Sequence, residues 1–67
     1  MEGKRFSGKR LRRMRERAKM AQFEMARQMS VEIDVISAWE RGSLLPGPNA
    51  INKLTAILRC EEADLYE

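Results

Sequence analysis

Apolar residues recur at intervals of three and four along most of this chain, and this spacing restricts the fold more than any other feature. Side chains three and four residues apart lie on one face of an α-helix, so each run predicts an amphipathic helix. The runs are Leu11, Met14 and Ala18; Met25, Ala26 and Met29; and Ile51, Leu54, Ile57 and Leu58. We predict helices over about 8–18, 22–29 and 33–41, a fourth that begins near Pro48, and a short fifth over about 61–66.

The segment VEIDVISAWERG, residues 31–42, is the one place where a strand competes with a helix. Its first five residues alternate apolar and acidic, as in a half-buried strand. However, Val35, Ile36 and Trp39 then follow at helical spacing, and the chain has no second strand pattern with which a single strand would pair. We therefore predict a helix that ends at Gly42, which tolerates the left-handed conformation of a helix C-terminus, and an all-α fold.

Basic residues are concentrated at the N-terminus. Residues 1–20 carry nine basic and two acidic side chains, a net charge of +7, whereas residues 21–67 carry four basic and eight acidic ones, a net charge of −4. The asymmetry suggests an anionic partner, although a solvated basic helix face would look the same. We expect residues 1–6 to form a flexible basic tail and residues 7–67 to form one domain.

Several classes of function are excluded by what the chain lacks. It has one cysteine, Cys60, and no histidine, so an internal disulfide and a Cys/His zinc site are excluded, and we expect no cofactor or metal. No apolar run is long enough to span a membrane. No nucleophile, base and stabiliser can be assembled together, so we expect neither enzymatic activity nor a small-molecule substrate. The composition suits the reducing cytoplasm.

One set of residues carries a resemblance to a known family. Gln22 opens the second predicted helix, Met25 and Ala26 follow, the third helix ends in Ile36-Ser37-Ala38-Trp39-Glu40-Arg41-Gly42, and Pro46 lies in the next loop. This arrangement resembles the phage repressor and Cro-type (XRE-like) family of DNA-binding transcriptional regulators. The resemblance implies a compact five-helix, lambda-repressor-like domain with a helix-turn-helix. It implies a bacterial or phage-encoded protein that acts in the cytoplasm, at the nucleoid, as a homodimer on double-stranded DNA.

The resemblance also implies a role for particular residues. Gln22 would contact a phosphate, and so would Arg41 with the Gly42–Ser43 backbone. Arg15 and Glu40 would form a structural ion pair. The charge of the first helix, and not the resemblance, leads us to expect further phosphate contacts from Arg10 and Arg13. The positions that would face base edges in the major groove are Glu32, Ile33, Asp34, Ser37 and Ala38.

This chain departs from the family pattern in three respects. The turn between the second and third helices has Ser30 where glycine is usual, which predicts strain. Ala21 stands where a serine or threonine usually caps the second helix, so a cap worth about 1 kcal/mol is missing. None of the five base-facing positions is Arg, Lys, Asn or Gln, the residues that contact guanine or adenine through two hydrogen bonds. We therefore expect DNA binding that depends on charge and shape.

Three other interpretations remain open, two of which concern Glu32 and Asp34. These residues lie at the predicted start of the third helix, where negative charge is favoured by roughly 0.3–1 kcal/mol per residue, so they need do no more than start it. Alternatively, the acidic and apolar face of Glu32, Ile33, Asp34 and Val35 contacts a basic protein partner. A basic amphipathic helix lying on a membrane is the weakest alternative, because the first helix has few apolar residues to insert.

Overall fold

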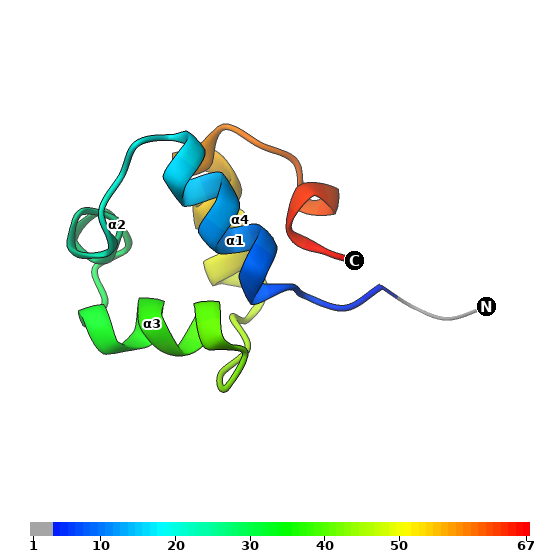
Figure 1. The fold of residues 1–67 in the computed structure, drawn as a ribbon, viewed down its shortest axis with the longest axis horizontal. Coiled ribbons are helices and arrows are strands. Elements are labelled where there is room, and N and C mark those ends of the chain that lie inside the picture. The colour runs from blue at the N-terminus through cyan, green and yellow to red at the C-terminus, as the bar shows by residue number, and fades with distance from the viewer. Residues whose placement is uncertain (1–3) are drawn as a thin grey trace.

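The computed structural model describes residues 4–67, which form four α-helices and one short 3-10 helix (Figure 1). The α-helices are α1 (Gly8–Arg17), α2 (Gln22–Met29), α3 (Ile33–Arg41) and α4 (Pro48–Leu58), and the 3-10 helix is η1 (Glu62–Leu65). The all-α prediction is therefore confirmed, and the ambiguous segment is a helix. Within residues 4–67 no helix is long and apolar enough to cross a membrane.

The short last helix predicted over about 61–66 is present as a single 3-10 turn over Glu62–Leu65, so the α-helices number four and not five. The N–H of Asp64 donates to the carbonyl of Glu61 at 2.9 Å, and that of Tyr66 to the carbonyl of Ala63 at 3.3 Å. These bonds join residues three apart, as in a 3-10 helix. Leu65 is the one buried residue in the turn, at 0 % exposure, so a single turn is enough to place it in the core.

The hydrophobic core lies where the helices meet. In Figure 1, α3 runs below α2 and the lower end of α1, while α4 lies behind α1. Each element supplies at least one fully buried side chain: Leu11, Met25, Ile36, Ile51, Leu54 and Leu65. Ala18, predicted on the apolar face of α1, is exposed because α1 ends at Arg17 and Ala18 caps it from outside the helix.

Gly8 allows the first turn of α1 to pack directly on the last turn of α3. A β-carbon at this position would lie 2.3 Å from the carbonyl oxygen of Glu40 and 2.5 Å from that of Trp39. Both neighbours are backbone atoms, which cannot rotate away, so only glycine fits. This contact sets the position of the basic helix α1 relative to α3.

The two ends of the described chain pair with each other. Arg5 and Glu67 exchange two backbone hydrogen bonds, of 3.1 and 2.8 Å, and Phe6 forms an isolated β-bridge with Tyr66. The rings of Phe6 and Tyr66 stack edge to face, with centroids 6.1 Å apart. Arg5 and Phe6 therefore belong to the folded domain and not to the tail predicted over residues 1–6. Residues 1–3 of that predicted tail lie outside the described residues.

Candidate nucleic-acid interface

A tight turn at Ser30 joins α2 to α3. Ser30 adopts the left-handed conformation, with φ 60° and ψ 43°, and its N–H donates to the carbonyl of Arg27 at 3.1 Å. The N–H of Val31 donates to the carbonyl of Ala26 at 3.0 Å, which closes the end of α2. Met25 and Ile36 are fully buried between the helices. The turn and this packing together leave one side of α3 directed outward.

The first turn of α3 presents acidic and apolar side chains to solvent. Glu32, Ile33 and Asp34 are exposed, Ile33 by 45 %, whereas Ser37 and Ala38 are half-buried. The side chain of Glu32 occupies the N-cap position without accepting a backbone hydrogen bond. Any contribution of the two carboxylates to starting this helix therefore comes from their charge alone.

A polar network around Glu40 joins α1, α2 and α3. Its carboxylate accepts hydrogen bonds from Arg15 Nε at 2.6 Å, Arg15 Nη2 at 3.2 Å and Gln22 Nε2 at 3.0 Å. Arg15 also donates through Nη1 to the carbonyl of Met20 at 2.8 Å. The side chains of Arg15 and Glu40 are only 11 % and 5 % exposed. The ion pair expected between them is thus present, and it fixes the side chain of Gln22 as well.

The charge of Arg15 is stabilised by this geometry. Its hydrogen bond with Glu40 raises the pKa of the guanidinium above the ordinary arginine value, against the opposing effect of burial. Arg15 therefore remains charged at neutral pH. Because Glu40 compensates that charge, the pair contributes little net positive field to its surroundings.

A polar hollow opens beside the network, between α1, α2 and α3. Its volume is about 370 Å³, and its lining consists of Arg12, Arg15, Gln22, Ser37, Glu40 and Arg41. Gln22 is the first residue of α2, so the hollow lies at a helix N-terminus, where backbone N–H groups favour an anion. Arg12 and Arg41 are exposed, and their charges are not compensated by Glu40. The hollow is suited to a phosphate group.

Arg41 and Arg12 are each held by a hydrogen bond along their own helix. Arg41 Nη1 donates to Ser37 Oγ at 2.6 Å, and Arg12 Nε donates to Glu16 Oε2 at 3.1 Å. The latter pair is exposed, with side chains 65 % and 55 % accessible, so it holds Arg12 only weakly. Both guanidinium groups keep further N–H donors for an anion.

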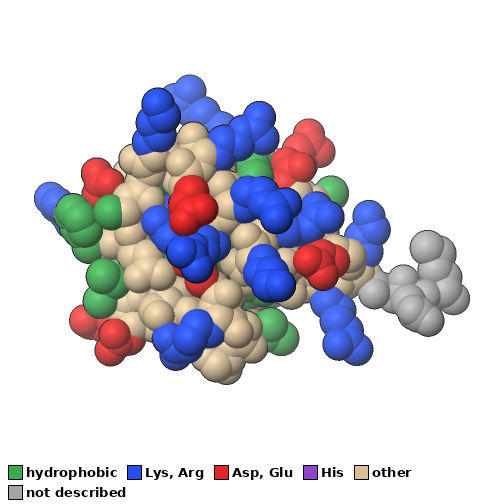
Figure 2. Space-filling view, viewed as in Figure 1, with side chains coloured by type: hydrophobic (Ala, Val, Ile, Leu, Met, Phe, Trp, Pro, Cys, Tyr) green, Lys and Arg blue, Asp and Glu red, His purple; other side chains and the backbone are tan. Residues whose placement is uncertain are grey.

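The predicted basic residues of α1 do not line this hollow. An α-helix advances by about 100° per residue, so Arg13 lies roughly a quarter-turn, and Arg10 nearly a half-turn, away from Arg12. Figure 2 shows basic side chains gathered over α1, whereas acidic and apolar ones lie where α3 begins. Arg12 was missed by sequence reasoning, although it precedes Arg15 by three residues and so shares its side of the helix.

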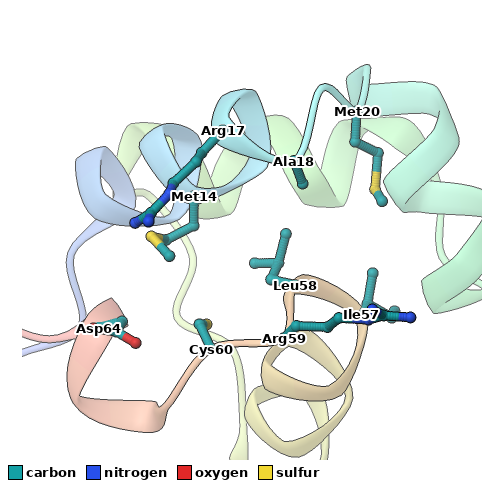
Figure 3. A pocket seen from close by; sticks show the side chains of 9 residues that line it. All are labelled: Met14, Arg17, Ala18, Met20, Ile57, Leu58, Arg59, Cys60 and Asp64. Carbon is teal, nitrogen blue, oxygen red and sulfur yellow. The ribbon is translucent and has the colours of Figure 1, made fainter.

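On its other side, α1 borders a second cavity, of about 570 Å³, between it and the ends of α4 and η1 (Figure 3). Arg17 and Arg59 line it together with Met14, Cys60 and Asp64. Burial, followed by the nearby charges of Asp64 and Glu61, raises the pKa of the Cys60 thiol, which disfavours the reactive thiolate. The positive charge of Arg17 is thus directed away from α3.

The loop after α3 uses its own amides to end the helix. Gly42, with φ 82°, donates its N–H to the carbonyl of Trp39 at 3.1 Å, and Ser43 donates to that of Ala38 at 3.0 Å. The Ser43 hydroxyl also donates to Ala38, at 3.3 Å. A phosphate contact through these two amides, as the resemblance implies, would compete with these bonds, which leaves the Arg41 side chain as the available donor at this end.

A model of the family described as "Helix-turn-helix domain" matches residues 8–67. The chain is similar to the crystal structure of the P22 c2 repressor in complex with a synthetic operator: the identity is 28 %, the TM-score is 0.83, and 91 % of this chain and 92 % of that chain are covered. It is also similar to the solution structure of the DNA-binding domain of that repressor, with 26 % identity, a TM-score of 0.84, and coverage of 96 % and 84 %. No curated protein sequence matches significantly. The chain therefore belongs to the helix-turn-helix family, and within it to the phage repressor type.

Proposed function

We propose that the protein is a transcriptional regulator that binds double-stranded DNA, with α3 in the major groove and phosphates on either side. The hollow formed by Arg12, Gln22 and Arg41 is the observation that carries this proposal. It combines a helix N-terminus with Arg41 and with Arg12, whose exposed ion pair with Glu16 is weak, and it lies directly beside the outward face of α3. The similarity to a repressor solved with its operator supports the same function.

The proposed interface divides the residues into two groups. Arg12, Arg41 and the N-terminus of α2 with Gln22 bind phosphates, which set affinity and position. Arg10 and Arg13 add long-range attraction for the backbone, while Gly42 and Ser43 hold the loop that places Arg41. The residues that face base edges are Glu32, Ile33, Asp34 and Ala38, whereas Ser37, expected among them, lines the hollow and accepts a hydrogen bond from Arg41.

Paired copies of the protein suit a two-fold operator. Helix-turn-helix dimers place their recognition helices about 34 Å apart, one turn of B-DNA, so that each enters the major groove of one half-site. We propose that the protein binds in this way, as a homodimer. Duplexes with half-sites moved by five base pairs, half a turn, should then bind more weakly than the parent duplex.

A salt titration tests the phosphate contacts. The double variant Arg12→Gln/Arg41→Gln should bind duplex DNA more weakly and reduce the slope of log K against log salt by about two, one for each lost contact. The matched control is Arg17→Gln/Arg59→Gln, which removes the same charge from the cavity between α1 and α4. If the two double variants lose affinity and slope equally, the hollow is not a phosphate site.

A protein contact is the second candidate function, because α2 and α3 expose apolar side chains. Phe23 is 55 % exposed and Ile33 is 45 % exposed, and Ile33 lies between two carboxylates. A basic, partly apolar protein surface would complement this face. Selection of bound duplexes from a random pool separates the two functions, since enrichment of a two-fold motif supports DNA binding and the absence of any enrichment supports protein contact.

A further inference from the structure

The exposed first turn of α3 offers an unusual combination of chemistry to a base pair. Within residues 4–67, the carboxylates of Glu32 and Asp34 take part in no side-chain hydrogen bond or ion pair. An ionised carboxylate only accepts hydrogen bonds. Ile33, which is exposed, and Ala38, which is half-buried one turn later, add apolar surface. This turn therefore presents acceptors and methyl groups, and no strong donor.

The hydroxyl of Ser37 lies on the side of α3 that faces the phosphate hollow. It lines that hollow with Arg12 and Gln22, and its oxygen already accepts a hydrogen bond from Arg41. By contrast, Asp34 and Ala38 are four residues apart, so they stack on one side of the helix. Base recognition consequently depends on the carboxylate of Asp34 and the methyl group of Ala38, with the side chain of Ile33 beside them.

The chemistry of base edges decides what this surface accepts. In the major groove guanine presents two acceptors, N7 and O6, which repel a carboxylate, whereas cytosine presents the N4 amino donor. Thymine presents a C5 methyl group that apolar side chains contact. Adenine has a donor but also the N7 acceptor beside it, so a carboxylate suits it less well than an amide does.

We infer that α3 selects cytosine through Asp34 and thymine through the methyl contacts of Ile33 and Ala38. The inference rests on the proposed DNA binding and names the base chemistry that the recognition helix reads. Affinity and register come from the phosphate hollow, while the carboxylate rejects sequences that place guanine acceptors against it. Discrimination between base pairs thus arises as much from repulsion of guanine acceptors as from attraction to cytosine and thymine.

The decisive experiment compares the duplexes that the parent protein and Asp34→Asn select from a random pool. An asparagine side chain both accepts and donates, and so pairs with adenine N6 and N7. We expect a position that is cytosine in the parent motif to become adenine in the variant motif, with a change in preference of at least about fivefold. Because Asp34 is exposed, the fold should survive. Glu62→Gln, which removes an exposed acidic charge from η1, is the matched control and should leave the motif unchanged.

Thymine contacts are tested on the selected duplex by replacing each thymine with deoxyuridine, which lacks only the methyl group. At a contacted thymine the affinity should fall about fourfold, the effect of losing one buried methyl group. Ile33→Ala should abolish that difference at a thymine that Ile33 contacts. The inference is overturned if Asp34→Asn and the parent select the same motif, or if no deoxyuridine substitution weakens binding. If the parent enriches no duplex at all, the proposed function itself fails, which is a different outcome.

Discussion

At the scale of single residues, Glu40 is the side chain on which the arrangement of α1, α2 and α3 most depends. It accepts hydrogen bonds from both Arg15 and Gln22 while only 5 % exposed. Removing one partner of a buried pair leaves the other charge without compensation, which costs more than the pair itself is worth. The ion pair was predictable because its two residues belong to the family pattern, whereas the bond from Gln22 to Glu40 was not.

We predict that Glu40→Ala lowers the free energy of unfolding by about 3 kcal/mol, because it leaves the Arg15 guanidinium buried and unpaired. Urea denaturation followed by circular dichroism measures this. The control is Glu16→Ala, which breaks the exposed pair with Arg12 and should cost less than about 1 kcal/mol. Equal losses for the two variants would show that burial of the Glu40 pair has no energetic consequence.

Gly8 is the second residue whose substitution should be costly. In Gly8→Ala the new β-carbon collides with the backbone carbonyls of Trp39 and Glu40, so α1 must move off α3, at a cost of about 2–3 kcal/mol. Gly47→Ala meets no atom within 4 Å and should cost less than about 1 kcal/mol. Thermal melting of both variants tests the prediction, and a Gly8→Ala protein as stable as the parent would contradict it.

At the scale of the elements, helical spacing was enough to place α1 and α2, while α3 also required that no second strand pattern exists in the chain. Each has apolar residues on one face and a clear ending, such as Gly42 for α3. Helical spacing does not identify the type of helix at η1. Four residues with one buried leucine are too few for a repeat of apolar residues that would distinguish a 3-10 turn from an α-helix. Sequence reasoning also missed the pairing of Arg5 with Glu67, since a backbone contact between chain ends leaves no pattern in the side chains.

Ser30 should limit the stability of the turn between α2 and α3. Its φ of 60° places a β-carbon in the left-handed region, which costs roughly 1–2 kcal/mol for a residue other than glycine. We predict that Ser30→Gly raises the free energy of unfolding by about 1 kcal/mol. Arg27→Gly, within α2, should instead lower it by about 1 kcal/mol. A less stable Ser30→Gly protein would mean that the serine makes a compensating contact.

The candidate interface was only partly predictable for a related reason. The charge of residues 1–20 identified α1 as basic, but a count of charges does not say which side of a helix faces α3. The packing of Gly8 and Arg15 against α3 determines that side, and it selects Arg12 over Arg10 and Arg13 for the hollow. The rotation of α1 about its axis is therefore set by tertiary contacts, namely the packing of Gly8 and the buried ion pair between Arg15 and Glu40.

At the scale of the whole molecule, the structure separates two faces. One combines the outward side of α3, the N-terminus of α2 and the exposed side chains of Arg12 and Arg41. The other combines η1 and the end of α4 with the cavity that Arg17, Arg59 and Cys60 line. The proposed function requires that DNA contact the first face and make no contact with the second.

An NMR titration of the isotope-labelled protein with duplex DNA, following every backbone amide, tests this division most directly. We predict that the largest shifts occur at Gln22, from Ile33 to Ala38, and at Arg12 and Arg41, with little change from Ile57 to Asp64. Addition of the same duplex at high salt should reverse the shifts. Shifts centred on the cavity between α1 and α4, or no shift along α3, would contradict the proposal that α3 and the hollow form the DNA-binding face.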